Sequence, residues 1–275
     1  MDAIQAAVLG FIQGLTEFLP VSSSGHLVLF QNLFGLTEPE LLFDICLHVG
    51  TLIAVCVVFW RDIWAVLAAF VSLPSLKKEA GSWSKLFAQN ESIRLSCLIV
   101  VGSIPTVFLG LVFKEMVDFL FGSVAIVGVM LLTTGFVLWF TKNAKTTGRT
   151  LEQMSFKDVL IIGFVQGLAI IPGISRSGST ISMALYLGID RRLAGRFSFL
   201  LSIPAICGAL VLGLNDGLAH NDISLGVILL GSLIAAMSGY IALKILLRLV
   251  NKGRLAWFAP YCWLLGVVAI VWAVV

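Results

Sequence analysis

The sequence predicts an all-α integral membrane protein in which six transmembrane helices and two re-entrant helix pairs form an inverted-topology repeat. Three observations support this prediction: the composition, the lengths of the apolar runs, and an internal repeat. Of the 275 residues, 59% are hydrophobic and only 12% are charged, about half the charged fraction of soluble domains. The net charge of +3 is small, and no basic run indicates a nucleic-acid partner. The five cysteines have no CxxC spacing, so they predict neither a disulfide framework nor a zinc site.

The first half of the chain, residues 1–150, begins with an apolar stretch that is broken in its middle. Residues 3–35 are interrupted by Pro20 and by the run from Ser22 to His26. Neither side of the break reaches the roughly 20 residues that a helix needs to cross a bilayer. We therefore expect two short helices that enter and leave the membrane on the same side. Full spans are expected at residues 42–60, 93–113 and 123–141, with a polar segment at about 72–92.

The second half, residues 155–275, has the same organisation. A broken stretch at 158–190 contains a polar, glycine-rich loop from Pro172 to Thr180. Spans are expected at 193–214, 225–249 and 257–275. The chain is therefore expected to form one membrane domain of two similar halves.

A shift of 153 residues aligns the first broken stretch with the second without a gap. The matching residues are Gly10, Phe11, Gln13, Gly14, Leu15, Ser22, Ser24 and Gly25 with Gly163, Phe164, Gln166, Gly167, Leu168, Ser175, Ser177 and Gly178. A weaker match pairs Gly102, Ser103 and Gly110 with Gly231, Ser232 and Gly239. Because each half holds three spans, an odd number, the second half is predicted to be inverted relative to the first. Inverted repeats with broken helices place their site near the midplane, where the halves meet.

The distribution of basic residues predicts the orientation in the membrane. Basic loops lie near 77–85, 142–157, 191–196 and 248–254, and loops without that excess lie near 114–122 and 215–222. By the positive-inside rule the basic loops face the cytoplasm, and all six predicted spans agree with this assignment. The first broken stretch then enters from the outer side and the second from the inner side.

The loop from Pro172 to Thr180 has the composition of an anion-binding site. Pro172 and Gly173 break regular structure, and the hydroxyl residues after them can cap a new helix that starts near Gly178. A helix N-terminus offers free backbone N–H groups to an anion, and Arg176 adds a planar cationic fork that suits phosphate. The predicted binding residues are Ser175, Arg176, Ser177, Gly178, Ser179 and Thr180. The alternative is a polar turn whose Arg176 contacts a lipid headgroup.

The first broken stretch supplies groups that can do chemistry. Gln13 and Glu17 are four residues apart, hence on one face of a helix, and a carboxylate inside a membrane is a functional candidate. Glu17 could ligate a metal, act as a general base or orient His26. Alternatively, it only forms a salt bridge to Arg176, and Gln13 only forms an interhelical hydrogen bond. Ser23, three residues before His26, is a candidate nucleophile.

A further pair, Asp44 and His48, is four residues apart near the outer end of the first predicted span. We interpret these two residues as interfacial or supporting. The two broken stretches together offer a carboxylate, an imidazole, hydroxyls, an arginine and N–H groups. Such a set suits phosphoryl transfer, where catalysis is mostly positioning and charge neutralisation. The apolar surroundings predict a substrate with a lipid tail.

The blocks Gln13–His26 and Pro172–Thr180 resemble the two signature motifs of the bacterial undecaprenyl-diphosphatase family, which confers resistance to bacitracin. The block Phe197–Pro204 is similar to a third family segment, so the resemblance covers essentially the whole chain. It implies hydrolysis of undecaprenyl diphosphate to the monophosphate, which recycles the lipid carrier for peptidoglycan synthesis. It also implies a multi-pass protein of the bacterial plasma membrane, with its active site open to the outer, periplasmic side.

Carried over by motif, the catalytic set is Glu17, Ser23, His26 and Arg176. The resemblance implies a divalent cation, Mg²⁺ or Ca²⁺, bound by Glu17 and Gln13. Gln13 stands where many family members have Glu, which weakens the expectation of a two-carboxylate metal site.

We expect Ser23 to attack the terminal phosphorus, His26 to accept its proton, and Glu17 to serve the metal or orient His26. Direct attack by His26 and attack by metal-bound water stay open. A different class of function, a polyprenyl-phosphate transporter or flippase, also fits inverted repeats with broken helices. It explains the cluster of Glu17, Ser23 and His26 less well, and a purely structural scaffold leaves every polar group unexplained.

Overall fold

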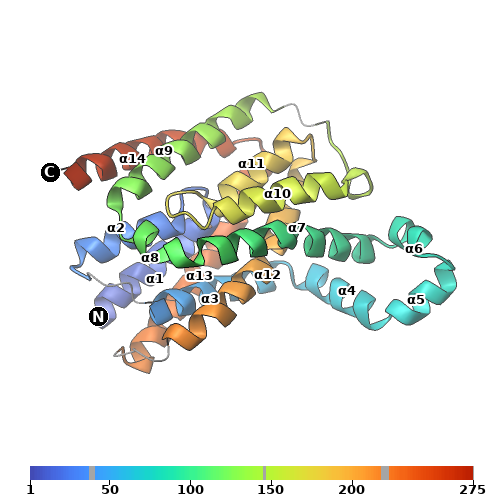
Figure 1. The fold of residues 1–275 in the computed structure, drawn as a ribbon, viewed down its shortest axis with the longest axis horizontal. Coiled ribbons are helices and arrows are strands. Elements are labelled where there is room, and N and C mark those ends of the chain that lie inside the picture. The colour runs from blue at the N-terminus through green and yellow to red at the C-terminus, as the bar shows by residue number, and fades with distance from the viewer. Residues whose placement is uncertain (37–40, 145–146, 218–222, 275) are drawn as a thin grey trace.

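A computed structural model describes residues 1–36, 41–144, 147–217 and 223–274 of the chain. Within these ranges the structure is helical, and its one β-type contact is an isolated bridge between Arg149 and Ile189. The long helices form a bundle in which α1 begins and α14 ends at the same end (Figure 1). The predicted all-α class is confirmed.

The helices of the first half follow the predicted order. The broken stretch forms α1 (Ala3–Phe18) and α2 (Ser23–Leu33). The predicted spans correspond to α3 (Leu41–Val58), α7 (Glu91–Phe113) and α9 (Val124–Phe140). Short helices connect or extend them: the 3₁₀ segments Lys114–Met116 and Thr141–Asn143, and α8 (Val117–Phe121).

The second half repeats this order. Its broken stretch forms α10 (Phe156–Leu168) and α11 (Arg176–Tyr186). The predicted spans correspond to α12 (Arg191–Gly217), α13 (Leu225–Asn251) and α14 (Ala259–Val274). Two 3₁₀ segments, Leu151–Gln153 and Leu255–Phe258, precede α10 and α14. In the described part of the chain, five helices are long and apolar enough to cross a membrane, or six if one bent pair counts as a span.

In that bent pair, α3 ends within two residues of the end predicted for the span at 42–60, but the helix that follows the bend was not predicted. The helix α3 ends at Val58, and α4 (Trp60–Val71) turns away from it by 81°. The turn coincides with the charged residues at the end of the apolar run. Asp62 accepts hydrogen bonds from Arg196 of α12, at 2.9 Å from Nε and 2.5 Å from Nη2. This ion pair links the start of α4 to α12 at the point where the chain turns away from α3.

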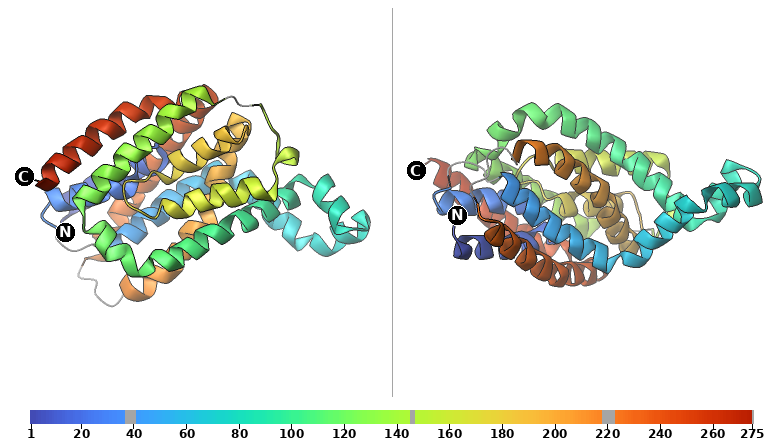
Figure 2. Two further views of the ribbon diagram at one scale, coloured as in Figure 1. Left: turned by 45° about the horizontal axis from the view of Figure 1, so that its top comes forward. Right: turned by 90° about the horizontal axis from the view of Figure 1, so that it is seen from below.

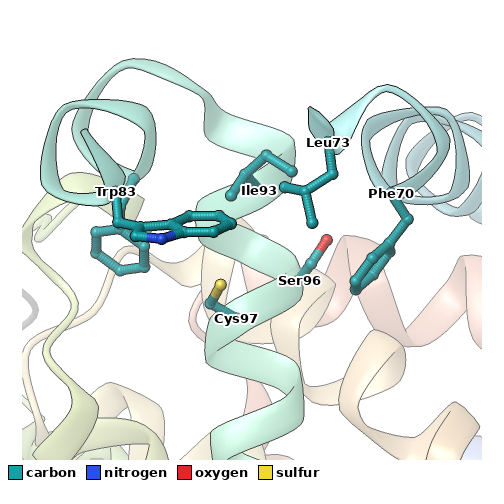
Figure 3. Close-up of a pocket in the computed structure, with 7 residues that line it drawn as sticks. Phe70, Leu73, Trp83, Ile93, Ser96 and Cys97 are labelled. Carbon is teal, nitrogen blue, oxygen red and sulfur yellow. The ribbon is translucent and has the colours of Figure 1, made fainter. Parts of the chain in front are cut away.

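After the turn, the chain forms a lobe that projects from the bundle, consisting of α4, α5 (Leu73–Ala80) and α6 (Trp83–Gln89) (Figure 1, Figure 2). The lobe packs against the start of α7 and contains a pocket of about 220 Å³ (Figure 3). The pocket is lined by Phe70, Leu73, Trp83, Phe87, Ile93, Ser96 and Cys97. No residue of either broken stretch lines it, and no lining residue is charged, so it is separate from the predicted site.

Glycines bring the helices of the two halves into close contact, as small residues do in membrane bundles. The helix α1 packs along α13, and α10 packs along α7. A Cβ added to Gly10 would lie 2.4 Å from the carbonyl oxygen of Gly231, and one added to Gly163 would lie 1.8 Å from that of Gly102. The repeat pairs these same four glycines, so equivalent contacts are exchanged between the halves. The inverted-topology repeat and the orientation of each half across a membrane stay predictions.

Candidate active site

The two breaks in the helices meet inside the bundle and hold each other. The Gly173 N–H donates to Ser22 Oγ at 3.1 Å, and Ser177 Oγ donates to the carbonyl oxygen of Phe18 at 2.9 Å. The ring of Phe18 is fully buried next to this contact. It packs edge-on against Phe199 of α12, with the ring centroids 5.7 Å apart. The first broken stretch therefore lies against the second, as the repeat led us to expect.

Ser22 holds the first break in an unusual backbone conformation. It is the one non-glycine residue of the described chain with positive φ, at φ 68° and ψ 96°. Such conformations cost about 1–3 kcal/mol and persist where the surroundings enforce them. Here Ser22 Oγ caps α2 by accepting from Gly25 N at 3.3 Å, while its carbonyl oxygen lies 2.7 Å from Nδ1 of His26. The strained turn aims the first residues of α2 at the second loop.

The second break is held by α9. Thr134 Oγ1 donates to the carbonyl oxygen of Gly173 at 2.8 Å and accepts from Ser175 N at 3.1 Å. Gly173 has φ 97°, and an added Cβ would lie 2.5 Å from the carbonyl oxygen of Val127. Only glycine fits such a position. Ser175 then caps α11, because its Oγ accepts from Gly178 N at 3.1 Å.

Glu17 lies at the centre of the polar cluster between the two breaks, with only 8% of the residue exposed. Its Oε1 accepts from Arg176 Nη2 at 2.5 Å. Its Oε2 accepts from Ser23 Oγ at 2.6 Å and from Gln13 Nε2 at 3.0 Å. Ser23 and Arg176 are 153 residues apart, so they occupy equivalent places in the repeat. One carboxylate of the first half therefore binds the two equivalent residues of both loops.

Two buried polar atoms next to this carboxylate have no hydrogen-bond partner in the described structure: Arg176 Nη1 and Gln13 Oε1. Leaving such a group unpaired inside a protein costs about 1–3 kcal/mol. One arm of the Arg176 fork therefore has no acceptor among the described residues, while the other is bonded to Glu17. The unpaired Gln13 Oε1 is a neutral oxygen that could bind a donor or a cation.

Several hydroxyls of the predicted anion-binding loop are already engaged inside the protein. Ser175 caps a helix, and Ser177 donates to Phe18. Thr180 donates to the carbonyl oxygen of Arg176 at 2.8 Å and also bonds to Ser198. The backbone N–H groups of Ser175, Gly178 and Ser179 also have acceptors within the protein. The donors left for a ligand are the free arm of Arg176 and the backbone N–H groups of Arg176 and Ser177, the first two residues of α11, which have no acceptor within their own helix. Anion binding at Ser175, Ser177, Gly178, Ser179 and Thr180 stays a prediction.

His26 is bonded on both ring nitrogens, away from Ser23. Nδ1 lies 2.7 Å from the carbonyl oxygen of Ser22, which can only accept, so Nδ1 carries the proton. Nε2 then accepts from the Tyr261 hydroxyl at 2.7 Å, and the two rings stack with centroids 5.8 Å apart. Proton transfer from Ser23 to His26 therefore stays a prediction, and Glu17 is the residue that receives the Ser23 hydrogen bond. Tyr261 was missed because nothing in the sequence links it to a residue 235 positions away.

His48 lies closer to the centre than the sequence indicated. Its Nε2 is 3.7 Å from Glu17 Oε2, and its Nδ1 is 2.7 Å from the carbonyl oxygen of Asp44. Asp44 Oδ1 in turn accepts from Gln31 Nε2 at 2.8 Å. The four-residue spacing of Asp44 and His48 was the available signal, but it did not reveal the contact with Glu17.

No group of three or more His, Cys, Asp or Glu side chains that could hold a metal ion is found among the described residues. The centre is instead one carboxylate surrounded by an arginine, two amide or hydroxyl donors and an imidazole. The expected divalent cation stays a prediction.

Comparison with known proteins places the chain in a family. The family model described as bacitracin resistance protein BacA matches residues 6–268. A protein of Desulfatibacillum aliphaticivorans named undecaprenyl-diphosphatase is 50% identical over 272 residues, covering 98% of this chain and 99% of the relative. A protein of the same name from Desulfosudis oleivorans is 52% identical, covering 97% of this chain and 97% of the relative. Another, from Carboxydothermus hydrogenoformans, is 44% identical, covering 98% of this chain and 97% of the relative. The chain therefore belongs to the bacitracin resistance protein BacA family.

Proposed function

We propose that this multi-pass membrane protein hydrolyses undecaprenyl diphosphate to undecaprenyl phosphate and inorganic phosphate. The reaction returns the lipid carrier to peptidoglycan synthesis and thereby confers resistance to bacitracin. The observation that carries the proposal is the buried cluster in which Glu17 binds both Ser23 and Arg176 at the meeting point of the two breaks. The relatives named undecaprenyl-diphosphatase support the same activity over the whole length of the chain.

Arg176 binds the diphosphate in this proposal. Glu17 holds Nη2, so the guanidinium is fixed in place, and the unpaired Nη1 donates to a phosphate oxygen. The backbone N–H groups of Arg176 and Ser177, the first two residues of α11, add donors for an anion at the helix N-terminus. These N–H groups and the guanidinium of Arg176 neutralise the charge that develops on the leaving phosphate.

We give the nucleophilic role to Ser23, as the sequence predicted. We give the acceptance of its proton to Glu17 instead of the expected His26, because both ring nitrogens of His26 are bonded to other groups. The Ser23 hydroxyl already donates to Glu17 Oε2 at 2.6 Å, within the range expected of a nucleophile and its base. The bond from Oγ to the terminal phosphorus forms as the bridging P–O bond breaks, and undecaprenyl phosphate leaves. Glu17 passes the Ser23 proton to the leaving undecaprenyl phosphate. Water then attacks the phosphorus of the phosphoserine and gives a proton to Glu17. The Ser23 oxygen leaves and takes up that proton, which releases inorganic phosphate and restores both residues. His26 fixes the backbone of Ser22 and the position of α2 through its bonds to Ser22 and Tyr261.

The residues of the cluster can accommodate a divalent cation. Gln13 Oε1 is buried and unpaired, and Glu17 Oε2 lies beside the same side chain. Magnesium sites commonly use one or two carboxylates and take their other ligands from substrate phosphates. Gln13 and Glu17 would hold the cation, which would neutralise part of the diphosphate charge.

We place the protein in the bacterial plasma membrane, with its site open to the outer side. The excess of basic residues in the loops near 142–157 and 248–254 supports this orientation.

The test is release of inorganic phosphate by the purified protein from a polyprenyl diphosphate, with and without EDTA. We expect release that chelation stops, and an acid-stable phosphoserine when labelled substrate is trapped during turnover. An acid-labile phosphohistidine would give the nucleophilic role to His26, and no phosphoenzyme at all would favour attack by water. Transport of a polyprenyl phosphate across vesicles without phosphate release would contradict the hydrolase proposal and favour a flippase.

A further inference from the structure

A second imidazole, that of His48, faces Glu17 from the helix α3. Its Nε2 lies 3.7 Å from Glu17 Oε2. The side chain is about one-third exposed, whereas that of Glu17 is 6% exposed. No role follows for His48 from the reaction as proposed above, which uses Glu17, Ser23 and Arg176.

The orientation of His48 leaves its lone pair directed at the cluster. Nδ1 lies 2.7 Å from the carbonyl oxygen of Asp44, which can only accept, so Nδ1 carries the ring proton. In the neutral ring, Nε2 is then a bare acceptor facing the carboxylate. Metal-binding histidines have this arrangement, because the other ring N–H almost always donates to a carbonyl, a carboxylate or water.

The separation of the two acceptors also suits a shared cation. At 3.7 Å the contact is too long for a hydrogen bond. Two ligands that each lie about 2.1 Å from one cation are separated by up to about 4.2 Å. The buried, unpaired Gln13 Oε1 belongs to the side chain whose Nε2 lies 3.0 Å from that same Glu17 oxygen. A ring nitrogen and a carboxylate oxygen therefore face each other, and the unpaired amide oxygen of Gln13 belongs to a side chain bonded to that carboxylate.

We propose that His48 Nε2 is a ligand of the divalent cation, together with Glu17 and Gln13. This inference rests on the proposed function, because it concerns the cation that acts in that site. It has a consequence for specificity. Imidazole nitrogen suits Fe²⁺, Ni²⁺ and Zn²⁺, whereas Mg²⁺, Ca²⁺ and Mn²⁺ prefer oxygen ligands, but Mn²⁺, a first-row transition metal, accepts a nitrogen ligand more readily than Mg²⁺ does. The site binds Mn²⁺ more tightly than Mg²⁺, and His48 supplies most of that difference.

The other described imidazole does not compete for this role. His26 has both ring nitrogens bonded, to Ser22 and to Tyr261. The alternative role for His48 is that of a protonated partner in an ion pair with Glu17. That alternative predicts no metal–nitrogen bond, so it can be separated from ligation by spectroscopy.

The experiment measures Mn²⁺ binding to the detergent-purified protein by electron paramagnetic resonance, with electron spin-echo modulation to detect a coordinated imidazole nitrogen. All samples carry His220→Gln, since His220 lies outside the described residues. We expect ¹⁴N modulation in this background and in His26→Gln, and its loss in His48→Gln. The Mn²⁺ dissociation constant should rise at least about tenfold in His48→Gln, whereas that for Mg²⁺ should change less than about threefold. A second variant, His48→Asn, and the thermal unfolding midpoint check that the effect is not misfolding.

The proposal is overturned if Mn²⁺ does not bind at millimolar concentration, if it binds without ¹⁴N modulation, or if the modulation persists in both His48 variants. The spectra are recorded on Mn²⁺ alone, without turnover, so their outcome is independent of phosphate release. Phosphate release without the nitrogen signal would refute ligation by His48 and leave the proposed function standing. The nitrogen signal without phosphate release would support ligation by His48 and contradict the proposed function.

Discussion

The replacement Arg176→Lys tests how the site binds a phosphate. The two terminal nitrogens of the guanidinium have different roles in the proposed reaction. Nη2 donates to Glu17 Oε1 at 2.5 Å, and Nη1, buried without a partner in the described structure, donates to a phosphate oxygen. Lysine keeps the positive charge but has a single nitrogen on a flexible stem. It can reach either Glu17 or a phosphate oxygen with good geometry, and we expect it to lose the second contact.

The expected magnitude follows from that one lost contact. A hydrogen bond to a charged group contributes about 1.5–3 kcal/mol. Because about 1.36 kcal/mol corresponds to tenfold in rate, turnover should fall between about tenfold and about 150-fold. The contact strengthens as charge develops on the phosphate, so the loss should appear mainly in kcat and less in KM.

The assay is steady-state phosphate release from a polyprenyl diphosphate in detergent, with the thermal unfolding midpoint recorded for each variant. The matched control is Arg196→Lys, because Arg196 also binds carboxylates, those of Asp62 at the start of α4 and Glu91 at the start of α7. We expect this control to change turnover less than about threefold. Turnover near the wild-type value in Arg176→Lys would refute the reasoning and leave Arg176 as an ion-pair partner or headgroup contact.

Three further predictions concern the nucleophile, the packing and the topology. Ser23→Ala should reduce phosphate release by orders of magnitude, since members of one catalytic unit act together; substantial residual activity would make Ser23 a binding group only. Gly163→Ala should lower the thermal stability in detergent by about 1–3 kcal/mol or more, because its Cβ would lie 1.8 Å from a backbone oxygen of α7. The control Gly208→Ala, which has nothing within 4 Å, should be neutral or stabilising; equal effects would contradict the packing argument. In a cysteine-free background, a Cys at Gly217 should react with an impermeant thiol reagent in intact cells and one at Thr147 should not; the opposite pattern would reverse the orientation.

Much of the architecture could be predicted because the forces that set it are local in the sequence. The length of an apolar run decides whether a helix can cross a bilayer, and residues such as Pro20 and Pro172 mark where helices break. The four-residue spacing of Gln13 and Glu17 also predicted that they share a helix face, and the two side chains form a hydrogen bond of 3.0 Å. The repeat predicted that the two broken stretches face each other.

The sequence did not predict the turn after α3. The apolar run ends at Trp60, Arg61 and Asp62, a pattern that fits the end of a span equally well whether the next helix continues or turns. The 81° change of direction accompanies the ion pair between Asp62 and Arg196, which are 134 residues apart. No local pattern encodes such a pairing.

The sequence by itself determined which residues are the candidates for the chemistry: a carboxylate, a serine, an imidazole and an arginine in two related loops. The tertiary structure decided which of them touch. Glu17 binds Ser23 and Arg176, whereas His26 turns to Tyr261, and His48 reaches Glu17 from another helix. The physical reason is that a hydrogen bond between distant residues depends on helix packing and side-chain rotamers to within about an ångström. The pattern of residues along one helix does not contain that information.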